Sequence, residues 1–316
     1  MPHTGRIKLF IPALALLVAI FITVAISTLL FPNQTLWANY KATNSIGSNF
    51  VTNPNKVAVL SAYFEQIDYN LEDVQKRKND VPRFFLKRLP EDISKIKSAK
   101  ERKKIFVKSI LPLILLVNED ITESRVAIIE MQNQIRNGVE LSKNQLKWLQ
   151  NAEYRYETKP LDWQELLNRV DIIPPSLAIA QAAEESGWGT SRFAKEGNAL
   201  FGQYTFGDSN GMLPKEREMG DQHLIRIYSN LAEGIRSYMH NLNYHYAYKD
   251  FRDARNKMRS NHKLVDGHVL ASTLVNYSER GFKYVKTIQD IISSNKLRRL
   301  DNTQLAKDSY VLSSLR

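Results

Sequence analysis

The chain has 316 residues, which is enough for one or two domains, and its apolar content is ample for a sizeable core. It contains no cysteine, so a disulfide bond, a thiolate metal site and a cysteine nucleophile are all excluded. The formal net charge of +11 predicts an anionic partner such as a membrane face, a nucleic acid or an acidic cell-wall polymer.

An uncharged, strongly apolar run extends from Leu9 to Phe31. It exceeds the roughly 20 residues that a membrane-spanning helix needs, and it is longer than the apolar core of a cleaved signal peptide. Two basic residues, Arg6 and Lys8, precede it, and no charge lies close behind it. The positive-inside rule therefore predicts a cytoplasmic tail at 1–8, a single transmembrane anchor at 9–32 and an extracytoplasmic remainder. That position argues against a nucleic-acid partner.

Residues 33–159 are predicted to form a polar tether followed by a helical spacer region. Apolar side chains recur every three or four residues over 56–71, a pattern typical of an amphipathic helix. The stretch 95–104 is rich in lysine and arginine, which indicates either a solvated helix face or a surface that attracts anionic glycan or lipid. The apolar segment 110–117 is too short to span a membrane, so it predicts a core helix. Further helices are predicted at 121–134 and 141–156.

The central stretch of the chain begins with a strong helix signal. Pro174 and Pro175 favour a helix start, where a missing N–H costs nothing. The run Leu177–Ala183 is almost wholly apolar, so this helix is predicted to be buried on most sides. Gly187 is a typical stop signal and predicts where the helix ends.

Two glutamates, Glu184 and Glu185, lie near the C-terminal end of this predicted helix. The helix dipole disfavours negative charge there, and partial loss of hydration raises the pKa of a carboxyl group, which suits a general acid. Helical spacing places Glu185 on the face of Gln181 and Glu184 on the face of Ala180, so the two cannot play the same part. A pair of ordinary surface acids is the alternative interpretation.

Turn residues are frequent over 203–228, and alternating apolar and polar side chains near its end predict a small β-hairpin lobe. This lobe carries Glu216 and Glu218, and glycosidic cleavage usually needs a second carboxylate of this kind. Sugar rings stack on aromatic side chains, which are dense around both regions. The aromatic residues are Trp188, Phe201, Tyr204, Phe206, Tyr238, Tyr244, Tyr246 and Tyr248.

Helices are predicted again at 231–246, 268–277 and 283–292, and the polar end of the chain is expected to fray from Arg299. The sequence contains no Gly-rich phosphate loop, no His-Glu-x-x-His zinc pattern and no Gly-x-Ser-x-Gly nucleophile elbow. No cofactor and no metal are therefore predicted.

A resemblance to a known family rests on two phrases. They are Ile-Pro-Pro-Ser-Leu-Ala-Ile-Ala-Gln-Ala-Ala-Glu-Glu-Ser-Gly-Trp-Gly-Thr-Ser at 173–191 and Asn-Ala-Leu-Phe-Gly at 198–202. Both closely resemble the glucosaminidase domain of glycoside hydrolase family 73, to which bacterial flagellar peptidoglycan hydrolases and autolysins belong. The resemblance implies a glucosaminidase domain at 160–298 and leaves a polar C-terminal tail at 299–316. It also implies a mainly α, lysozyme-like α+β fold with a small β-hairpin lobe.

The resemblance also implies roles for individual residues. Glu185, directly before Ser-Gly-Trp-Gly, matches the general acid of the family, whereas Glu184 stands where relatives usually have an apolar residue. The second carboxylate of the family lies on the β-hairpin, which departs here from the usual Thr-Thr-Glu pattern. Glu218 is the first choice for it and Glu216 the second. Tyr238 matches a tyrosine that lines the active site of relatives and is expected to position the substrate's acetamido group.

Trp188, expected beneath the acid, completes the predicted substrate-binding residues together with Tyr204 and Phe201. The predicted protein is an endo-β-N-acetylglucosaminidase that binds peptidoglycan, is anchored in the bacterial inner membrane and has its catalytic domain in the periplasm. Two alternatives stay open: a lytic transglycosylase, which uses one acid and releases an anhydro sugar, and a non-catalytic wall-binding or scaffolding protein. Activation of water by the second carboxylate and assistance by the substrate's own acetamido group are equally open.

Overall fold

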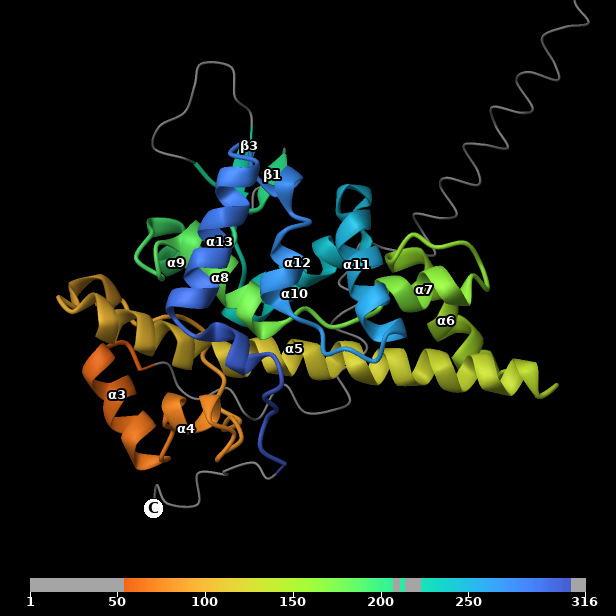
Figure 1. Ribbon diagram of the computed structural model, residues 1–316, viewed down its shortest axis with the longest axis horizontal. Coiled ribbons are helices and arrows are strands. Elements are labelled where there is room, and N and C mark those ends of the chain that lie inside the picture. Colours follow the sequence, from red (N-terminus) through yellow and green to blue (C-terminus); the bar gives the residue numbers. More distant parts are fainter. Residues whose placement is uncertain (1–53, 207–210, 214–222, 308–316) are drawn as a thin grey trace, which may run out of the picture. The chain divides into compact units, whose positions relative to one another are not determined.

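The computed structural model describes residues 54–206, 211–213 and 223–307 (Figure 1). The predicted anchor at 9–32 lies outside the described residues, as do the two hairpin glutamates, Glu216 and Glu218. Within the part of the chain that is described, no helix combines the length and the apolar character that crossing a membrane requires.

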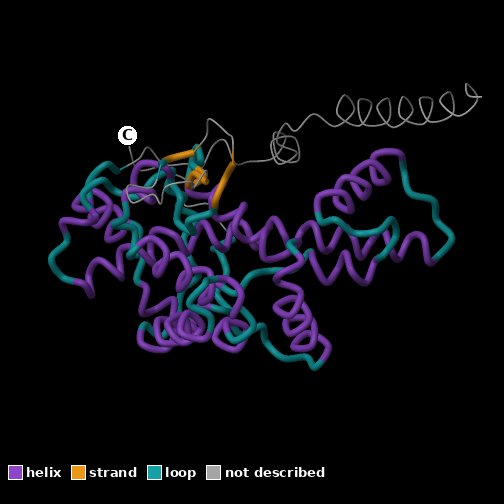
Figure 2. The backbone as a smooth tube through the Cα atoms, turned by 90° about the horizontal axis from the view of Figure 1, so that it is seen from above, coloured by secondary structure: helices purple, strands orange, loops and turns teal. Residues whose placement is uncertain are grey.

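Helices make up most of the described chain, which confirms the mainly helical part of the predicted fold (Figure 2). The α-helices are α3 (Val57–Gln66), α4 (Leu71–Gln75), α5 (Ala99–Arg136), α6 (Lys143–Arg155), α7 (Trp163–Arg169), α8 (Pro175–Ser186), α9 (Arg192–Gly197), α10 (Leu231–Tyr244), α11 (Lys249–Ser260), α12 (Gly267–Ala271) and α13 (Phe282–Ser294). Short 3-10 helices are η1 (Ile93–Lys95), η2 (Tyr246–Tyr248), η3 (Val275–Tyr277) and η4 (Leu297–Leu300).

Helix α5 joins segments that the sequence predicted as separate helices at 110–117 and 121–134. Ser98 caps its start, because the Ser98 hydroxyl accepts a backbone hydrogen bond from the first turn. Pro112 removes one backbone hydrogen bond from the interior of the helix. The helix nevertheless continues, because every residue from 105 to 117 is buried and tertiary packing outweighs the local preference.

Helices α8 and α10 both contact α5, which is the long yellow helix of Figure 1. Helix α8 also contacts α12, α13 and η4, so other helices surround it on several sides. Its residues Leu177–Ala183 are all buried, as the apolar run predicted. One cluster of buried apolar side chains includes residues on both sides of position 160, so the spacer region and the following helices share a core.

The strands β1 (Tyr204–Phe206), β2 (Gly211–Met212) and β3 (His223–Arg226) form a small antiparallel sheet in which β3 is the middle strand. The predicted small β lobe is therefore confirmed, but it has three strands rather than the two of a hairpin. Ile225 of β3 lies opposite Tyr204 on one side and Met212 on the other. Gly211 is required, because a Cβ atom there would lie 2.4 Å from the Cβ of Leu224.

The polar end of the chain was expected to fray from Arg299, and this expectation is wrong for the residues up to Lys307. Leu300 and Leu305 are buried. Val81 pairs with this segment through both of its backbone groups: its N–H donates to the carbonyl of residue 304 at 2.9 Å, and its carbonyl accepts from the N–H of residue 306 at 2.8 Å. Two leucines and two backbone hydrogen bonds therefore hold a segment that looks polar in sequence.

Candidate active site

Helix α8 ends in a tight turn directly after the two glutamates. Gly187 caps the helix with φ of 57°, in the left-handed region that favours glycine, as the sequence predicted. Trp188 and Gly189 also have positive φ values, 58° and 78°. The Ser186 hydroxyl holds the turn, because it accepts a hydrogen bond from the Gly189 N–H at 2.8 Å. The main chain therefore reverses direction at the point where the two carboxylates lie.

The two glutamates have different partners, as their positions on different helix faces predicted. Glu184 forms an ion pair with Arg280, whose Nη1 lies 2.5 Å from Oε1. Glu185 instead accepts a hydrogen bond on Oε1 from the Tyr284 hydroxyl at 3.0 Å. The charge of Glu184 is thus balanced by a guanidinium, whereas Glu185 faces a neutral donor.

Partial loss of hydration raises the pKa of Glu185 above its ordinary value. The hydrogen bond from Tyr284 lowers that pKa, the charge of Glu184 raises it, and the more distant charge of Arg280 lowers it again. Glu185 is nevertheless still partly exposed to solvent, so its carboxyl group is not sealed inside the protein. A carboxyl group with a raised pKa keeps its proton to higher pH, and its exposure makes that proton accessible to a substrate.

Three buried side chains form a hydrogen-bonded chain behind Glu185. Tyr238 of α10 donates from its hydroxyl to Gln181 Oε1 at 2.6 Å. Gln181 donates from Nε2 to the Tyr284 hydroxyl at 2.9 Å, and Tyr284 donates onward to Glu185. Tyr238, Gln181 and Tyr284 are each at most 1% exposed. The chain therefore fixes one oxygen of the carboxyl through contacts between α8, α10 and α13.

Stacked aromatic rings pack against this chain. The Tyr277 ring stacks on the Tyr284 ring, with centroids 5.3 Å apart. The Tyr248 ring packs against Tyr277, with centroids 5.9 Å apart. Burial raises the pKa of both Tyr277 and Tyr284, so their hydroxyls stay neutral. Tyr284 is therefore a donor to Glu185 over the whole range in which that carboxyl titrates.

The structure brings two of the predicted substrate-binding residues together. The Phe201 and Tyr238 rings stack with centroids 3.8 Å apart and an interplanar angle of 2°. Both residues are buried, at 5% and 1% exposed, and the Tyr238 hydroxyl is used by Gln181. Together they support the hydrogen-bonded chain from the side of α10 and the segment before β1.

The other two predicted substrate-binding residues lie in different surroundings. Trp188 is half-buried and packs against α5, with its ring 5.8 Å from Phe106 and the Lys103 ammonium 4.8 Å above it. These contacts attach the turn after α8 to helix α5. Tyr204, on β1, is 61% exposed. An aromatic ring exposed to this extent is of the kind on which sugar rings stack.

Sequence reasoning missed Gln181 and Tyr284 as parts of the site. Gln181 carried a signal, because it is the one polar side chain inside the apolar run Leu177–Ala183, and a buried amide needs hydrogen-bond partners. Tyr284 carried none: it lies 99 positions after Glu185, and only the packing of α13 against α8 brings it there. Across the described ranges, no group of three or more His, Cys, Asp or Glu side chains is placed to hold a metal ion.

Comparisons with known proteins can be set beside this geometry. Residues 161–297 match the family model described as glucosaminidase, mannosyl-glycoprotein endo-beta-N-acetylglucosaminidase. The chain is 33% identical to protein Bax from Escherichia coli strain K12 over 199 residues, which cover 61% of this chain and 69% of that protein. It is also similar to the catalytic domain of the autolysin Auto from Listeria monocytogenes, with a TM-score of 0.36 and 17% identity, over 74% of this chain and 98% of that domain.

Proposed function

The chain belongs to the glucosaminidase family of glycoside hydrolases, and on this premise we propose that it is an endo-β-N-acetylglucosaminidase of peptidoglycan. The bond cleaved is the β-1,4 link on the N-acetylglucosamine side of the glycan strand. The helical domain with its small sheet is then a lysozyme-like catalytic domain. Peptidoglycan also fits the net charge of +11, because the peptide stems of the cell wall carry carboxylates.

The observation that carries the proposal is the environment of Glu185. Cleavage of a glycosidic bond needs a proton donor to the leaving oxygen, and the donor must hold its proton near the working pH. Glu185 is exposed, has a raised pKa and is oriented by Tyr284 through a 3.0 Å hydrogen bond. Glu185 then protonates the leaving oxygen, while its second oxygen is left available for the substrate.

The second carboxylate comes from the chain between β2 and β3. Glu218 is the first candidate and Glu216 the second, and either would activate water or stabilise the oxocarbenium-like charge that develops on the sugar. Tyr204, on the neighbouring strand β1, supplies an exposed ring for a sugar of the glycan. Tyr238 and Phe201 support the acid from within, and Trp188 holds the turn beneath it.

The location of the enzyme follows from the first residues of the sequence. The apolar run Leu9–Phe31 serves as a single-pass anchor in the bacterial inner membrane, with the basic residues Arg6 and Lys8 on the cytoplasmic side. The remainder of the chain then lies in the periplasm, where peptidoglycan is its substrate. A protease-protection experiment on spheroplasts tests this: cleavage of the intact chain by external protease is expected, and protection would contradict it.

Mass spectrometry of digested peptidoglycan tests the activity itself. The full chain and its Glu185→Gln variant are incubated with purified peptidoglycan, and the new sugar ends are identified. Reducing N-acetylglucosamine ends that are absent with the variant are expected. Anhydro ends would assign the chain to the lytic transglycosylases instead, and binding without cleavage would favour a non-catalytic wall-binding protein.

A further inference from the structure

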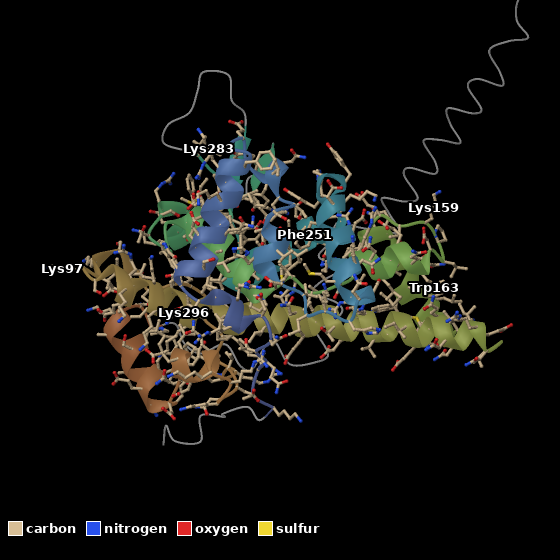
Figure 3. All side chains as sticks on the ribbon, viewed as in Figure 1. Lys97, Lys159, Trp163, Phe251, Lys283 and Lys296 are labelled. Atoms are coloured by element: carbon tan, nitrogen blue, oxygen red, sulfur yellow. The ribbon has the colours of Figure 1, made fainter. Side chains whose placement is uncertain are left out.

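A pocket of about 310 Å³ lies between α3 and the first turns of α5, and neither Glu185 nor Trp188 lines it. Its lining residues lie between positions 61 and 108, which is outside the 161–297 range matched by the glucosaminidase model. Lys97, labelled in Figure 3, immediately precedes α5 and marks this end of the helix. The pocket therefore belongs to the region that precedes the catalytic domain, and the proposed activity assigns no role to it.

A largely buried lysine lines this pocket. Lys108 is 8% exposed, and its Nζ lies 4.2 Å from the centre of the Phe64 ring and 5.1 Å from that of the Tyr69 ring. Among the described residues, Lys108 Nζ makes no hydrogen bond and no ion pair. Burial lowers the pKa of Lys108 to about 8, with Lys104 lowering it and Glu65 opposing, so the group is still charged at neutral pH. A partly desolvated charge without a counter-ion is unfavourable, and an anion entering the pocket would supply the counter-ion.

A second group without a partner lies beside it. Tyr69 also lines the pocket and is 3% exposed, and its hydroxyl has no hydrogen-bond partner in the described part of the chain. Burial raises the pKa of Tyr69, so the hydroxyl stays protonated and is a donor. A buried donor without an acceptor costs free energy, which a bound acceptor restores. Lys108 and Tyr69 together thus call for the same kind of ligand group, an anionic oxygen.

The outer residues of the pocket carry the opposite charge. Glu65, Asp68 and Glu101 are all exposed and line the same space, whereas Lys104 is the exposed cation among them. An inorganic anion would meet these three carboxylates on its way in and gain nothing from them. A ligand with a carboxylate at one end and an ammonium group at the other matches both parts of the pocket.

We propose that this pocket binds a short peptide through its free carboxylate, which pairs with Lys108 and accepts from Tyr69, while an amino group of the same peptide faces the acidic outer residues. This inference rests on the proposed function, and the peptide is then the stem peptide of peptidoglycan. The region before the catalytic domain then holds the wall at its peptides while the catalytic domain cuts its sugars. Two contacts with one polymer strengthen each other through effective concentration.

Titration calorimetry with the full chain tests the binding. The probe is the stem peptide released from purified peptidoglycan by an amidase, compared with the same peptide after amidation of its carboxylates. Lys108→Met and Tyr69→Phe are each expected to weaken binding of the free peptide by about 10-fold or more, because each removes a hydrogen bond to a charged group. Amidation of the peptide should have the same effect. Lys76→Met and Tyr63→Phe change the C-cap of α4 and a residue of α3 outside the pocket; they are matched controls and should bind as wild type does.

The proposal is overturned if the wild-type chain does not bind the free peptide, or if it binds the amidated peptide equally well. It is also overturned if the Tyr69→Phe chain, folded by circular dichroism, binds as wild type does. Activity is measured separately on intact peptidoglycan and on glycan strands stripped of their peptides. Lys108→Met should slow cleavage of intact peptidoglycan and leave cleavage of the stripped strands unchanged. If wild type cleaves neither intact peptidoglycan nor the stripped strands, the proposed function is wrong. The binding experiment still tests the pocket in that case.

Discussion

Asp171, before α8, and Glu185, in its last turn, are two acidic side chains with opposite surroundings. Asp171 is 3% exposed, accepts two hydrogen bonds from Arg259 at 2.6 and 2.7 Å, and lies 3.7 Å from the Nε of Arg255. Glu185 is exposed and accepts a hydrogen bond from a neutral phenol. The pKa is lowered at Asp171 and raised at Glu185.

Burial raises the pKa of both carboxyl groups, and the charged partners of Asp171 reverse that shift there. Burial raises the pKa of Asp171, but the charges of Arg255, Arg259 and Arg125 together lower it by more. Among the described residues no cation forms an ion pair with Glu185, and the neighbouring Arg280 pairs with Glu184. The first carboxylate therefore stays ionised and stabilises the fold, whereas the second keeps its proton to higher pH.

Removing the charge of Glu185 should affect activity, whereas removing the charge of Asp171 should affect stability. Glu185→Gln is expected to lower kcat/KM on peptidoglycan by about 10²- to 10⁴-fold, because a general acid contributes that much. It should change the free energy of unfolding by less than about 0.5 kcal/mol, since the side chain is exposed and the amide is nearly isosteric. Release of new sugar ends and thermal unfolding measure the two effects. Glu184→Gln is the matched control and should retain activity within a few-fold.

Asp171→Asn should show the converse. We expect the free energy of unfolding to fall by about 3–5 kcal/mol, because the change leaves buried guanidinium groups without their counter-ion. Urea unfolding measures this loss. Asp253→Asn is the control: Asp253 pairs with Lys249 on the surface, and losing that pair should cost less than about 1 kcal/mol. Equal losses for the two variants would contradict the role of Asp171 as the counter-ion of Arg255 and Arg259.

Asp301 is a third carboxyl group, which is largely buried like Asp171 but accepts hydrogen bonds from neutral donors, as Glu185 does. It accepts hydrogen bonds from the Ser176 N–H and hydroxyl, both at 2.8 Å, and from the Gly267 N–H at 3.0 Å. Burial raises its pKa to about 6. In the folded state Asp301 keeps its proton up to about pH 6, whereas in the unfolded state it loses the proton near pH 4. The free energy of unfolding therefore falls by about 1.4 kcal/mol per pH unit between about pH 4 and pH 6, and it is level above about pH 6.

Unfolding free energies measured from pH 3 to pH 8 test this for wild type and Asp301→Asn. The free energy of unfolding of wild type should fall between about pH 4 and pH 6, and Asp301→Asn should lack this fall. Asp171 acts in another window: its lowered pKa gives stability that is present above its ordinary pKa and is lost only as the pH falls below about 4. A slope that survives in Asp301→Asn would assign the raised pKa to another group.

Local signals in the sequence were enough to predict α8 and its end. Two prolines, an apolar run and Gly187 act within a few residues of each other, and the structure follows them closely. The difference between Glu184 and Glu185 was also predictable, because helical spacing alone sends them to different neighbours.

Features that depend on distant contacts were not predictable. Helix α11 was missed because its sequence is dense in charge and looks like a solvated loop. Arg255 is nevertheless fully buried, since its guanidinium donates to the carbonyl oxygens of Asp171 and Asn168 at 2.9 and 2.8 Å. Phe251, labelled in Figure 3, is buried on the same helix and anchors it to the core. Tyr284 likewise has a role only because α13 packs against α8.

The smallest expected effect concerns the donor to Glu185. Tyr284→Phe should lower kcat/KM by about 3- to 10-fold, the value of one neutral hydrogen bond. The hydrogen bond from Tyr284 lowers the pKa of Glu185, so its loss should raise that pKa and move the alkaline limb of the pH–activity profile to higher pH. Tyr246→Phe, at an exposed position, is the control and should leave the profile unchanged. A limb that moves to lower pH would contradict this. It would mean that Tyr284 stabilises the protonated form of Glu185 and so holds the proton in place.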